Sequence, residues 1–305
     1  MKTCKLLREQ VAAATGSKKA ELVLKNAQIV NVFTQSVETG DIAIEGGYIV
    51  GIGNYEGITE KDLGGAYVCP GFLDGHIHIE SSMTSPGEFE RAVVPHGTIA
   101  VITDPHEIAN VAGTAGIRFM MQSAQKLDLD VYFMLPSCVP ATDLDESGAE
   151  LLARDLEPFY ADEKVLGLAE MMNAFGVTHG DKGCFEKLVQ ARSLKKAIDG
   201  HAPALSGKEL NAYVTAGIRS DHECSDFEEA KEKFASNGVK YLGCLCCTVS
   251  IDNLFKDLLQ LFLTYKEINL KKQFVSRYAS VHKSKVLRKD LVEQETSQCG
   301  LNIAA

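Results

Sequence analysis

The spacing of apolar residues changes twice along the chain and divides it into stretches of different secondary structure. Residues 3–14 place apolar positions at helical spacing, which predicts a short polar-faced helix inside an N-terminal extension, residues 1–19. Two β-type runs follow, AELVLKNAQIVNV and DIAIEGGYIVGIG, with turn residues at Thr39-Gly40 and Gly46-Gly47. The runs predict a small antiparallel β unit over residues 20–69.

Beyond residue 70 the pattern alternates between apolar runs and helical stretches. The runs TIAVITDP, VYFMLPS and VLGLAEM read as strands, and residues 146–159 and 183–198 read as helices. Strands that alternate with helices predict βα units and a parallel sheet, and therefore an α/β fold. The last stretch, residues 237–305, contains IDNLFKDLLQLFLTYKEI, whose helical spacing predicts a packed helix.

Two histidines stand one residue apart in GFLDGHIHIESSM. In a strand, alternate side chains leave the same face, so His76 and His78 point together and can bind one metal ion. Glu170, His201 and His222 lie 92, 123 and 144 residues beyond His78. A (β/α)8 barrel uses about 31 residues per unit, so these spacings place the five residues at the ends of strands 1, 4, 5 and 6. The five side chains would then meet at the carboxyl end of the barrel.

Each of these residues has an ordinary explanation when it is taken alone. The histidine pair can be a surface feature, Glu170 a solvated strand end, and His201 or His222 a hydrogen-bonded loop residue. Their common register with one barrel favours a metal site instead. Asp199 and Asp221 lie just before two of the histidines, where acidic groups orient ligating imidazoles.

Such a set of ligands is typical of hydrolysis. Two divalent cations bridged by a carboxylate lower the pKa of water towards neutrality, and imidazole with carboxylate suits zinc, manganese or iron. A further group must carry a proton to the leaving group. Glu223 is one candidate, with an exposed loop acid as its alternative explanation, and His106-Glu107 at the end of strand 2 are others.

Composition narrows the class of partner. The net charge is -10 and the pI about 5.3, which argues against nucleic-acid or anionic-membrane binding and favours a small-molecule partner. The nine cysteines lack the dense regular spacing of a secreted disulfide scaffold, and the N-terminus has no apolar stretch of signal-peptide length. No run reaches the roughly 18 apolar residues that span a bilayer. These features predict a cytoplasmic protein.

The motifs PGFLDGHIHIESSM, TDPHEIANV, GLAEMMN, DGHAPALSGKELNAYVTAGI and SDHE resemble the adenine deaminase family of the amidohydrolase superfamily over about residues 20–236. The resemblance implies a (β/α)8 TIM-type barrel, with strands 1–6 in residues 70–236, joined to a small β-sandwich. It implies hydrolysis of adenine to hypoxanthine and ammonia, a binuclear centre with manganese favoured over iron, and a purine partner. A homo-oligomer is compatible with it.

The resemblance also implies roles for individual residues. Glu80, Ser81 and Ser82 of the ESSM segment are the candidate substrate-binding residues. Glu170 would bridge the two ions where many relatives use a carboxylated lysine. The implied metal ligands are His76, His78, Glu170, His201 and His222.

The sequence departs from the family near its C-terminus. The family carries an aspartate at the end of strand 8, and Arg277-Tyr278 stand near the expected position. Residues 237–305 are therefore expected to be divergent, with room for barrel units 7 and 8, and the barrel incomplete. Two alternatives stay open. One is a truncated or impaired paralogue that binds metal or purine without turnover, and the other is a cyclic amidohydrolase acting on a hydantoin- or dihydropyrimidine-like ring.

Overall fold

The computed structural model describes residues 4–142 and 144–235, which form two compact units, residues 4–71 and residues 72–235. The predictions for residues 237–305, including the packed helix and barrel units 7 and 8, lie outside the described residues. In the part that is described, no helix combines the length and the apolar character needed to cross a bilayer.

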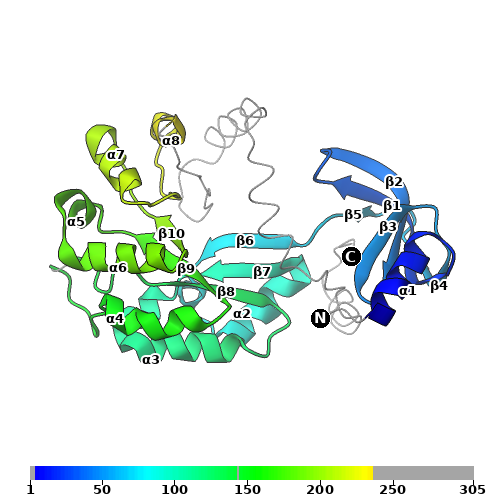
Figure 1. Cartoon of the computed structure of the whole chain (residues 1–305), viewed down its shortest axis with the longest axis horizontal. Helices are drawn as coiled ribbons and strands as arrows, with labels where there is room; N and C mark the ends of the chain where they lie inside the picture. The colour runs from blue at the N-terminus through cyan, green and yellow to red at the C-terminus, as the bar shows by residue number, and fades with distance from the viewer. Residues whose placement is uncertain (1–3, 143, 236–305) are drawn as a thin grey trace. The chain divides into compact units, whose positions relative to one another are not determined.

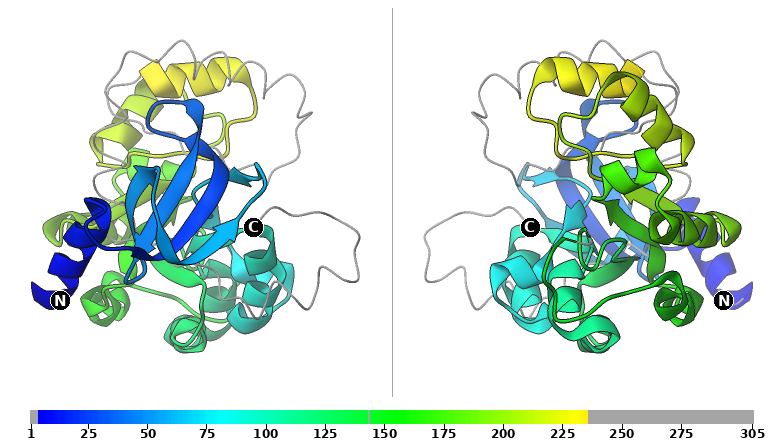
Figure 2. Two further views of the ribbon diagram at one scale, coloured as in Figure 1. Left: turned by 90° about the vertical axis from the view of Figure 1, so that its right-hand side faces the viewer. Right: turned by 90° about the vertical axis from the view of Figure 1, so that its left-hand side faces the viewer.

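Residues 4–71 form one helix and a mixed sheet. The elements are α1 (Cys4–Ala14), β1 (Ala20–Asn31), β2 (Ser36–Glu45), β3 (Tyr48–Gly53), β4 (Gly57–Asp62) and β5 (Tyr67–Val68). Strands β1, β2 and β3 are antiparallel neighbours, whereas β4 and β5 both run parallel to β1 (Figure 2). The predicted helix is confirmed. The purely antiparallel unit is wrong, because the chain crosses from β3 to the other side of β1 and enters β4 in the parallel direction.

One of the two predicted turns in this unit is correct. Gly46 and Gly47 connect β2 to β3 with φ of 59° and 74°, a left-handed conformation that glycine adopts without strain. Thr39-Gly40 lies inside β2 instead, and the preceding turn ends at Gln35, whose φ is 58°. Glutamine rarely adopts this left-handed conformation, so the sequence gives no signal for a turn at Gln35.

Residues 72–235 form a curled sheet of parallel strands with helices on its outer face (Figures 1 and 2). The strands are β6 (Phe72–Ile77), β7 (Thr98–Thr103), β8 (Asp130–Leu135), β9 (Val165–Met171) and β10 (Ala197–Gly200). The helical segments are η1 (Ile79–Ser82), α2 (Pro86–Val93), η2 (Val94–His96), α3 (His106–Ala124), α4 (Ala153–Leu156), η3 (Glu157–Ala161), α5 (Ala174–His179), α6 (Lys182–Ser193), α7 (Gly207–Thr215) and α8 (Phe227–Ala235).

The strands pair in chain order from β6 to β10, and every pair is parallel. A doubly wound sheet reverses its strand order at a switch point, whereas a barrel keeps the chain order. The predicted βα units are therefore confirmed for strands 1 to 5. Because the strands run in one direction, their carboxyl ends share one edge of the sheet.

The core of this unit lies between the strands and the helices. Phe133, Leu135 and Leu168 are buried on the sheet, and Ile117 and Leu188 face them from α3 and α6. Strands covered on both faces consist of nearly continuous apolar runs, which is why VYFML and VLGLA are recognisable in the sequence.

Two predicted elements differ from the structure. Residues 216–226 contain no regular strand, so the strand expected to end at His222 is not formed there. Side chains replace the ladder bonds: the Gly200 amide donates to the Ser220 hydroxyl, and the Ala202 amide donates to the Asp221 carboxylate. The helix expected over residues 146–159 begins only at Ala153.

Candidate metal centre

The carboxyl edge of the parallel sheet collects the histidines and acids that the sequence singled out. His76 lies in β6, and His78 follows the strand directly. Glu170 lies near the end of β9, and His201 follows β10. His222 reaches the same place from the irregular segment after α7. The predicted convergence of these five residues is therefore found in the structure.

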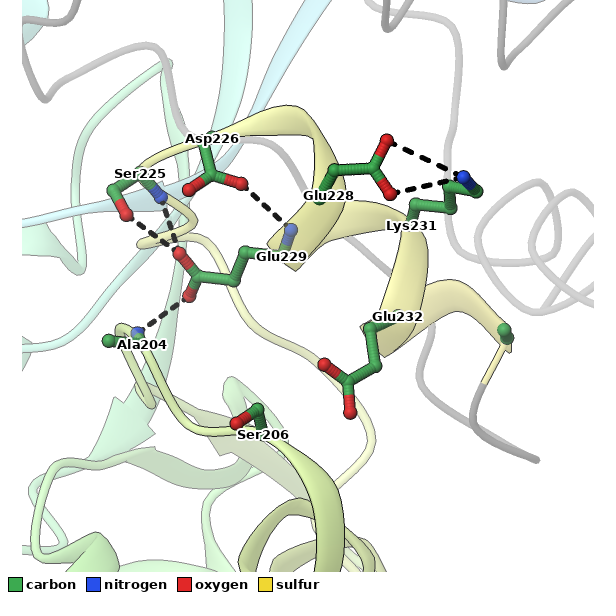
Figure 3. Close-up of a pocket in the computed structure, with 9 residues that line it drawn as sticks. Ala204, Ser206, Ser225, Asp226, Glu228, Glu229, Lys231 and Glu232 are labelled. Atoms are coloured by element: carbon green, nitrogen blue, oxygen red, sulfur yellow. Dashed lines mark hydrogen bonds and ion pairs between the residues drawn. The ribbon is translucent and has the colours of Figure 1, made fainter.

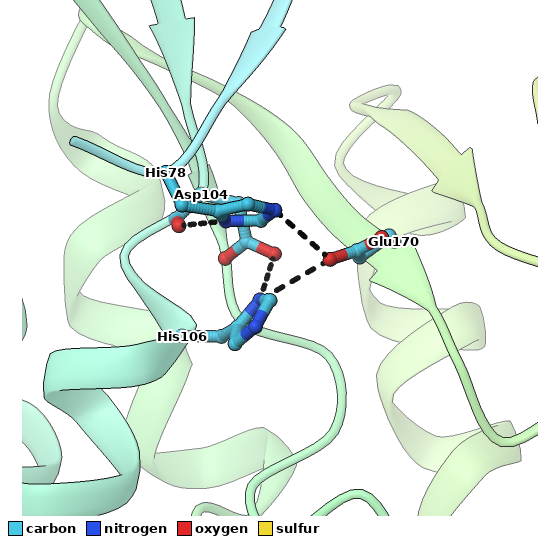
Figure 4. Close-up of side chains that lie close together, drawn as sticks. All are labelled: His78, Asp104, His106 and Glu170. Carbon is cyan, nitrogen blue, oxygen red and sulfur yellow. Dashed lines mark hydrogen bonds and ion pairs between the residues drawn. The ribbon is translucent and has the colours of Figure 1, made fainter. Parts of the chain in front are cut away.

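Glu170 occupies the middle of this cluster, and only 2% of it is exposed. Its Oε2 atom lies 2.8 Å from Nδ1 of His201 and 2.9 Å from Nε2 of His222. Its Oε1 atom lies 3.3 Å from Nε2 of His78 and 3.3 Å from Nδ1 of His106 (Figure 4). The two oxygens of one carboxylate thus face two different pairs of imidazoles.

The first donor group consists of His78, Asp104, His106 and Glu170. His106 donates from Nδ1 to Oδ2 of Asp104 at 2.8 Å, and His78 donates from Nδ1 to the Asp104 carbonyl at 2.8 Å (Figure 4). The second bond fixes the His78 ring so that its Nε2 atom faces Glu170. The other oxygen of Asp104, Oδ1, is buried and has no hydrogen-bond partner among the described residues.

The second donor group surrounds His76. Nδ1 of His76 lies 3.3 Å from Oδ2 of Asp199, and the His76 and His222 rings lie 3.8 Å apart, measured between centroids. Nε2 of His76 lies 3.2 Å from Nε2 of His78, so both imidazoles of the histidine pair point to one place, as the strand period predicts. Asp199 is buried and also bonds to Ser220, which holds it against His76.

These donor groups fit divalent cations. A third group consists of Glu170, His201 and His222, so Glu170 belongs to this group and to the first. The candidate ligand atoms lie within 4.8 Å of one another in each group. Imidazole nitrogens and carboxylate oxygens are the donors that zinc, manganese and iron accept. The buried Oδ1 of Asp104 lacks the partner that a buried carboxylate oxygen needs, and a cation supplies one.

Comparison with known proteins identifies the family. A family model described as "Amidohydrolase family" matches residues 67–291, which is most of the chain. The chain belongs to the amidohydrolase family.

The sequence similarity extends to curated enzymes named adenine deaminase. "Adenine deaminase 2" of Carboxydothermus hydrogenoformans is 54% identical over 231 residues, covering 76% of this chain and 40% of that protein. "Adenine deaminase" of Clostridium acetobutylicum is 54% identical over 227 residues, covering 74% of this chain and 40% of that protein.

This amidohydrolase spans about 40% of the length of the curated relatives that it matches. Among solved structures, an N-acyl-D-glutamate deacylase from Bordetella bronchiseptica, complexed with zinc and a phosphonate inhibitor, aligns with a TM-score of 0.51 at 14% identity. The alignment covers 73% of this chain and 58% of the deacylase. Together with the curled sheet of parallel strands in chain order, this likeness shows a TIM-type barrel fold.

The pKa values of the site reflect the interaction of its carboxylate with its imidazoles. Burial raises the pKa of Glu170, but hydrogen bonds from His201, His222 and His78 outweigh burial and hold this pKa well below its usual range. Burial likewise opposes the charged form of His78, yet Glu170 and Asp104 raise its pKa to about 10. A cation takes neutral imidazole, so its binding must release these protons.

The candidate proton-transfer residues lie at different distances from the cluster. His106 is part of the first donor group, so the geometry favours a ligand or orienting role over the proton transfer expected from sequence. Oε1 of Glu223 lies 3.8 Å from Nε2 of His222, at the rim of the cluster. Glu107 points elsewhere, because it is exposed and accepts a hydrogen bond from the Ser81 hydroxyl at 2.5 Å.

The candidate substrate-binding residues lie on η1, directly after His78. Oε1 of Glu80 accepts a hydrogen bond from the Ile108 amide at 3.3 Å, while its Oε2 is buried without a partner among the described residues. Ser82 donates to the Ile79 carbonyl at 2.6 Å and Ser81 contacts Glu107. The segment is thus tied to the start of α3, beside the first donor group.

Sequence reasoning missed Asp104 as a member of the site. Asp104 stands in TDPHE, one residue after the apolar run TIAVI, and Glu170 directly follows the apolar run VLGLA. Asp104 is 1% exposed and contacts both His78 and His106. An acid just after an apolar strand is the sequence signal that could have identified Asp104 as a site residue.

The hydroxyl of Tyr213 on α7 supports the strand ends. It donates to the Met171 carbonyl at 2.6 Å and accepts from the His201 amide at 3.0 Å. We expect Tyr213→Phe to lower the free energy of unfolding by about 2 kcal/mol, because both backbone groups lose a buried partner. Urea denaturation followed by circular dichroism measures this change.

Tyr160→Phe is the matched control for that substitution. The Tyr160 hydroxyl is buried and has no hydrogen-bond partner among the described residues, so its removal is expected to leave stability equal or slightly higher. An equal loss in both variants would show that the hydroxyl bonds of Tyr213 contribute nothing specific.

Proposed function

We propose that this amidohydrolase converts adenine and water to hypoxanthine and ammonia at a pair of divalent cations. The observation that carries the proposal is Glu170, whose two carboxylate oxygens face separate pairs of imidazoles. Relatives 54% identical in this region carry the name adenine deaminase, which supports the purine substrate. The homo-oligomer and the cytoplasmic location stay predictions from the sequence.

We assign the cations to the two sides of Glu170. His78, Asp104 and His106 would hold one cation with Oε1, and His201 and His222 would hold the other with Oε2. His76 lies close to both sets of ligands, with Nε2 3.2 Å from Nε2 of His78 and 4.0 Å from Oε2 of Glu170. Manganese is favoured, since two carboxylates accompany the imidazoles and manganese accepts oxygen donors readily.

When bound, the cations lower the pKa of water towards neutrality and so supply a nucleophile. The protein's own residues fix the imidazoles: the Asp104 carbonyl holds Nδ1 of His78, and Asp199 holds Nδ1 of His76. These bonds keep each Nε2 atom directed at the centre and select its tautomer.

The reaction moves one proton from the attacking water to the departing nitrogen. The water oxygen forms a bond to C6 of adenine, and the bond from C6 to the amino nitrogen breaks as ammonia leaves. We assign the proton transfer to Glu223, whose carboxylate lies 3.8 Å from His222 at the edge of the donor cluster. Glu80, Ser81 and Ser82 would contact the purine from η1.

An adenine assay on this chain tests the proposal. Protein stripped by a chelator and dialysed is expected to lose at least about 10²-fold of its rate, because it then lacks the cations that lower the pKa of the attacking water. Added manganese should restore the rate, read as the ultraviolet change from adenine to hypoxanthine. Manganese-loaded protein that binds the ion but leaves adenine unchanged would contradict deaminase activity and favour a non-catalytic binding protein.

A substrate panel separates adenine from other ring amides. We expect no turnover of hydantoin or dihydropyrimidine by manganese-loaded protein under conditions in which adenine is consumed. Turnover of either ring in place of adenine would overturn the substrate assignment while leaving the metal centre intact.

A further inference from the structure

A buried ion cluster lies outside the donor groups, where α8 packs on two loops. Lys233 of α8 is 1% exposed, and its Nζ atom donates three hydrogen bonds. The acceptors are Oδ2 of Asp221 at 2.5 Å, Oε1 of Glu229 at 2.5 Å and the Ala202 carbonyl at 2.6 Å. A fully buried lysine requires such compensation, because an unpaired ammonium is costly away from water.

Two of these three acceptors, Ala202 and Asp221, are chain neighbours of proposed ligands. Ala202 follows His201, and Asp221 precedes His222. The Asp221 carboxylate also accepts the Ala202 amide at 3.4 Å and the Glu223 amide at 3.0 Å. One ammonium therefore connects the two loops that deliver His201 and His222 to Oε2 of Glu170.

Glu229 extends this connection from α8. It accepts the Ala204 amide at 2.7 Å, the Ser225 amide at 2.9 Å and the Ser225 hydroxyl at 2.7 Å (Figure 3). Glu229 thus contacts the loop after β10 and the loop before α8, and Lys233 neutralises it within the cluster.

The cluster contains side chains of the kind that bind a metal cation, but the positive charge among them is the ammonium of Lys233. Asp221, Cys224 and Glu229 offer candidate ligand atoms within 4.8 Å of one another. Burial lowers the pKa of Lys233, but its hydrogen bonds to Asp221 and Glu229 outweigh burial and raise the pKa above its ordinary value. The ammonium stays charged, and this set of acids needs no metal ion.

We propose that Lys233 is a positioning residue for the cation on the His201 and His222 side of Glu170. The inference rests on the proposed metal centre and assigns Lys233 no contact with substrate or metal. Without the ammonium, the carboxylates of Asp221 and Glu229 repel each other and the Ala202 carbonyl loses its donor. The two loops then move apart, and the imidazoles no longer reach their common oxygen.

The test measures manganese binding to Lys233→Met by isothermal titration calorimetry, with circular dichroism to show that the variant is folded. Methionine retains the apolar stem and removes the charge. We expect the manganese affinity to fall about 10- to 100-fold, the range found when groups behind metal ligands are removed. No substrate is needed, so the result is independent of adenine turnover.

Lys231→Met is the matched control on the same helix. Lys231 is exposed and pairs with the exposed Glu228 (Figure 3), so its loss should leave manganese affinity within about twofold. A folded Lys233→Met variant that binds manganese as tightly as the parent would overturn the proposal, because a purely structural role changes stability alone.

A second variant covers the case in which Lys233→Met does not fold. Asp221→Asn keeps the side-chain shape and leaves Lys233 paired with Glu229, and it is expected to lose manganese affinity about 3- to 10-fold. Parent-like affinity in this variant would overturn the proposal. If the unsubstituted protein binds no manganese, both the metal centre and the inference are overturned. If it binds manganese but does not deaminate adenine, only the proposed reaction fails, and the affinity measurement still decides the inference.

Discussion

Glu170→Gln is expected to lower kcat/KM for adenine by about 10³-fold or more and to leave the protein with fewer bound cations. Glutamine keeps the shape of the side chain but presents one carbonyl oxygen and one NH2 group. The NH2 group must face either the His78 and His106 pair or the His201 and His222 pair. On that side a donor replaces an acceptor, and a cation no longer finds its carboxylate oxygen.

Metal analysis beside steady-state kinetics checks this result. Glu163→Gln is the matched control, because Glu163 is an exposed acid before β9 and carries the same substitution away from the cluster. It should retain parent-like rate and cation content. A Glu170→Gln variant with two cations per chain and half of the parent rate would contradict the bridging position of Glu170.

The strand register explains why much of the site could be predicted. Side chains in a strand alternate, so HIH places His76 and His78 together without knowledge of the rest of the chain. The 31 residues from Glu170 to His201 equal one βα unit, and the structure has β9 and β10 as neighbours with these residues near their ends. Local period and unit length are properties that a sequence displays directly.

Two features that the sequence did not reveal depend on side-chain hydrogen bonds between segments distant in sequence. In the segment before His222, which lacks a regular strand, Ser220 bonds to the backbone of the last residue of β10 and Asp221 to the backbone just after β10. Lys233 looks like a surface lysine of an amphipathic helix until Asp221 and Glu229 enclose it. Such partners depend on the tertiary fold, which no local pattern of apolar residues records.

The expected absence of the strand-8 aspartate is a prediction that falls outside the described residues. In the family, this aspartate takes a proton from the attacking water and binds metal. Its expected absence therefore affects the assignment of proton transfer to Glu223 and the number of carboxylates in the site. Asp104 changes that count, since it adds a buried acid to the donor group of His78 and His106. Whether Asp104 serves as a ligand or only orients His106 can be decided by one substitution.

Asp104→Asn is expected to weaken manganese binding and lower kcat/KM by about 10²-fold, while the metal-free protein keeps its stability to within about 1 kcal/mol. The amide oxygen can still accept from Nδ1 of His106, so the ring keeps its position. Oδ1 has no partner among the described residues, so no protein contact is lost there in the metal-free state. The larger effect of the lost charge is therefore expected on cation binding.

Calorimetry with manganese and urea denaturation in chelator separate the two effects. Asp181→Asn is the control: Asp181 caps α6 by accepting the Cys184 amide, and asparagine caps a helix equally well, so stability and affinity should both stay at parent values. If Asp104→Asn instead lowers metal-free stability and spares manganese affinity, Asp104 is a structural partner of His106, and the first donor group reduces to His78, His106 and Glu170.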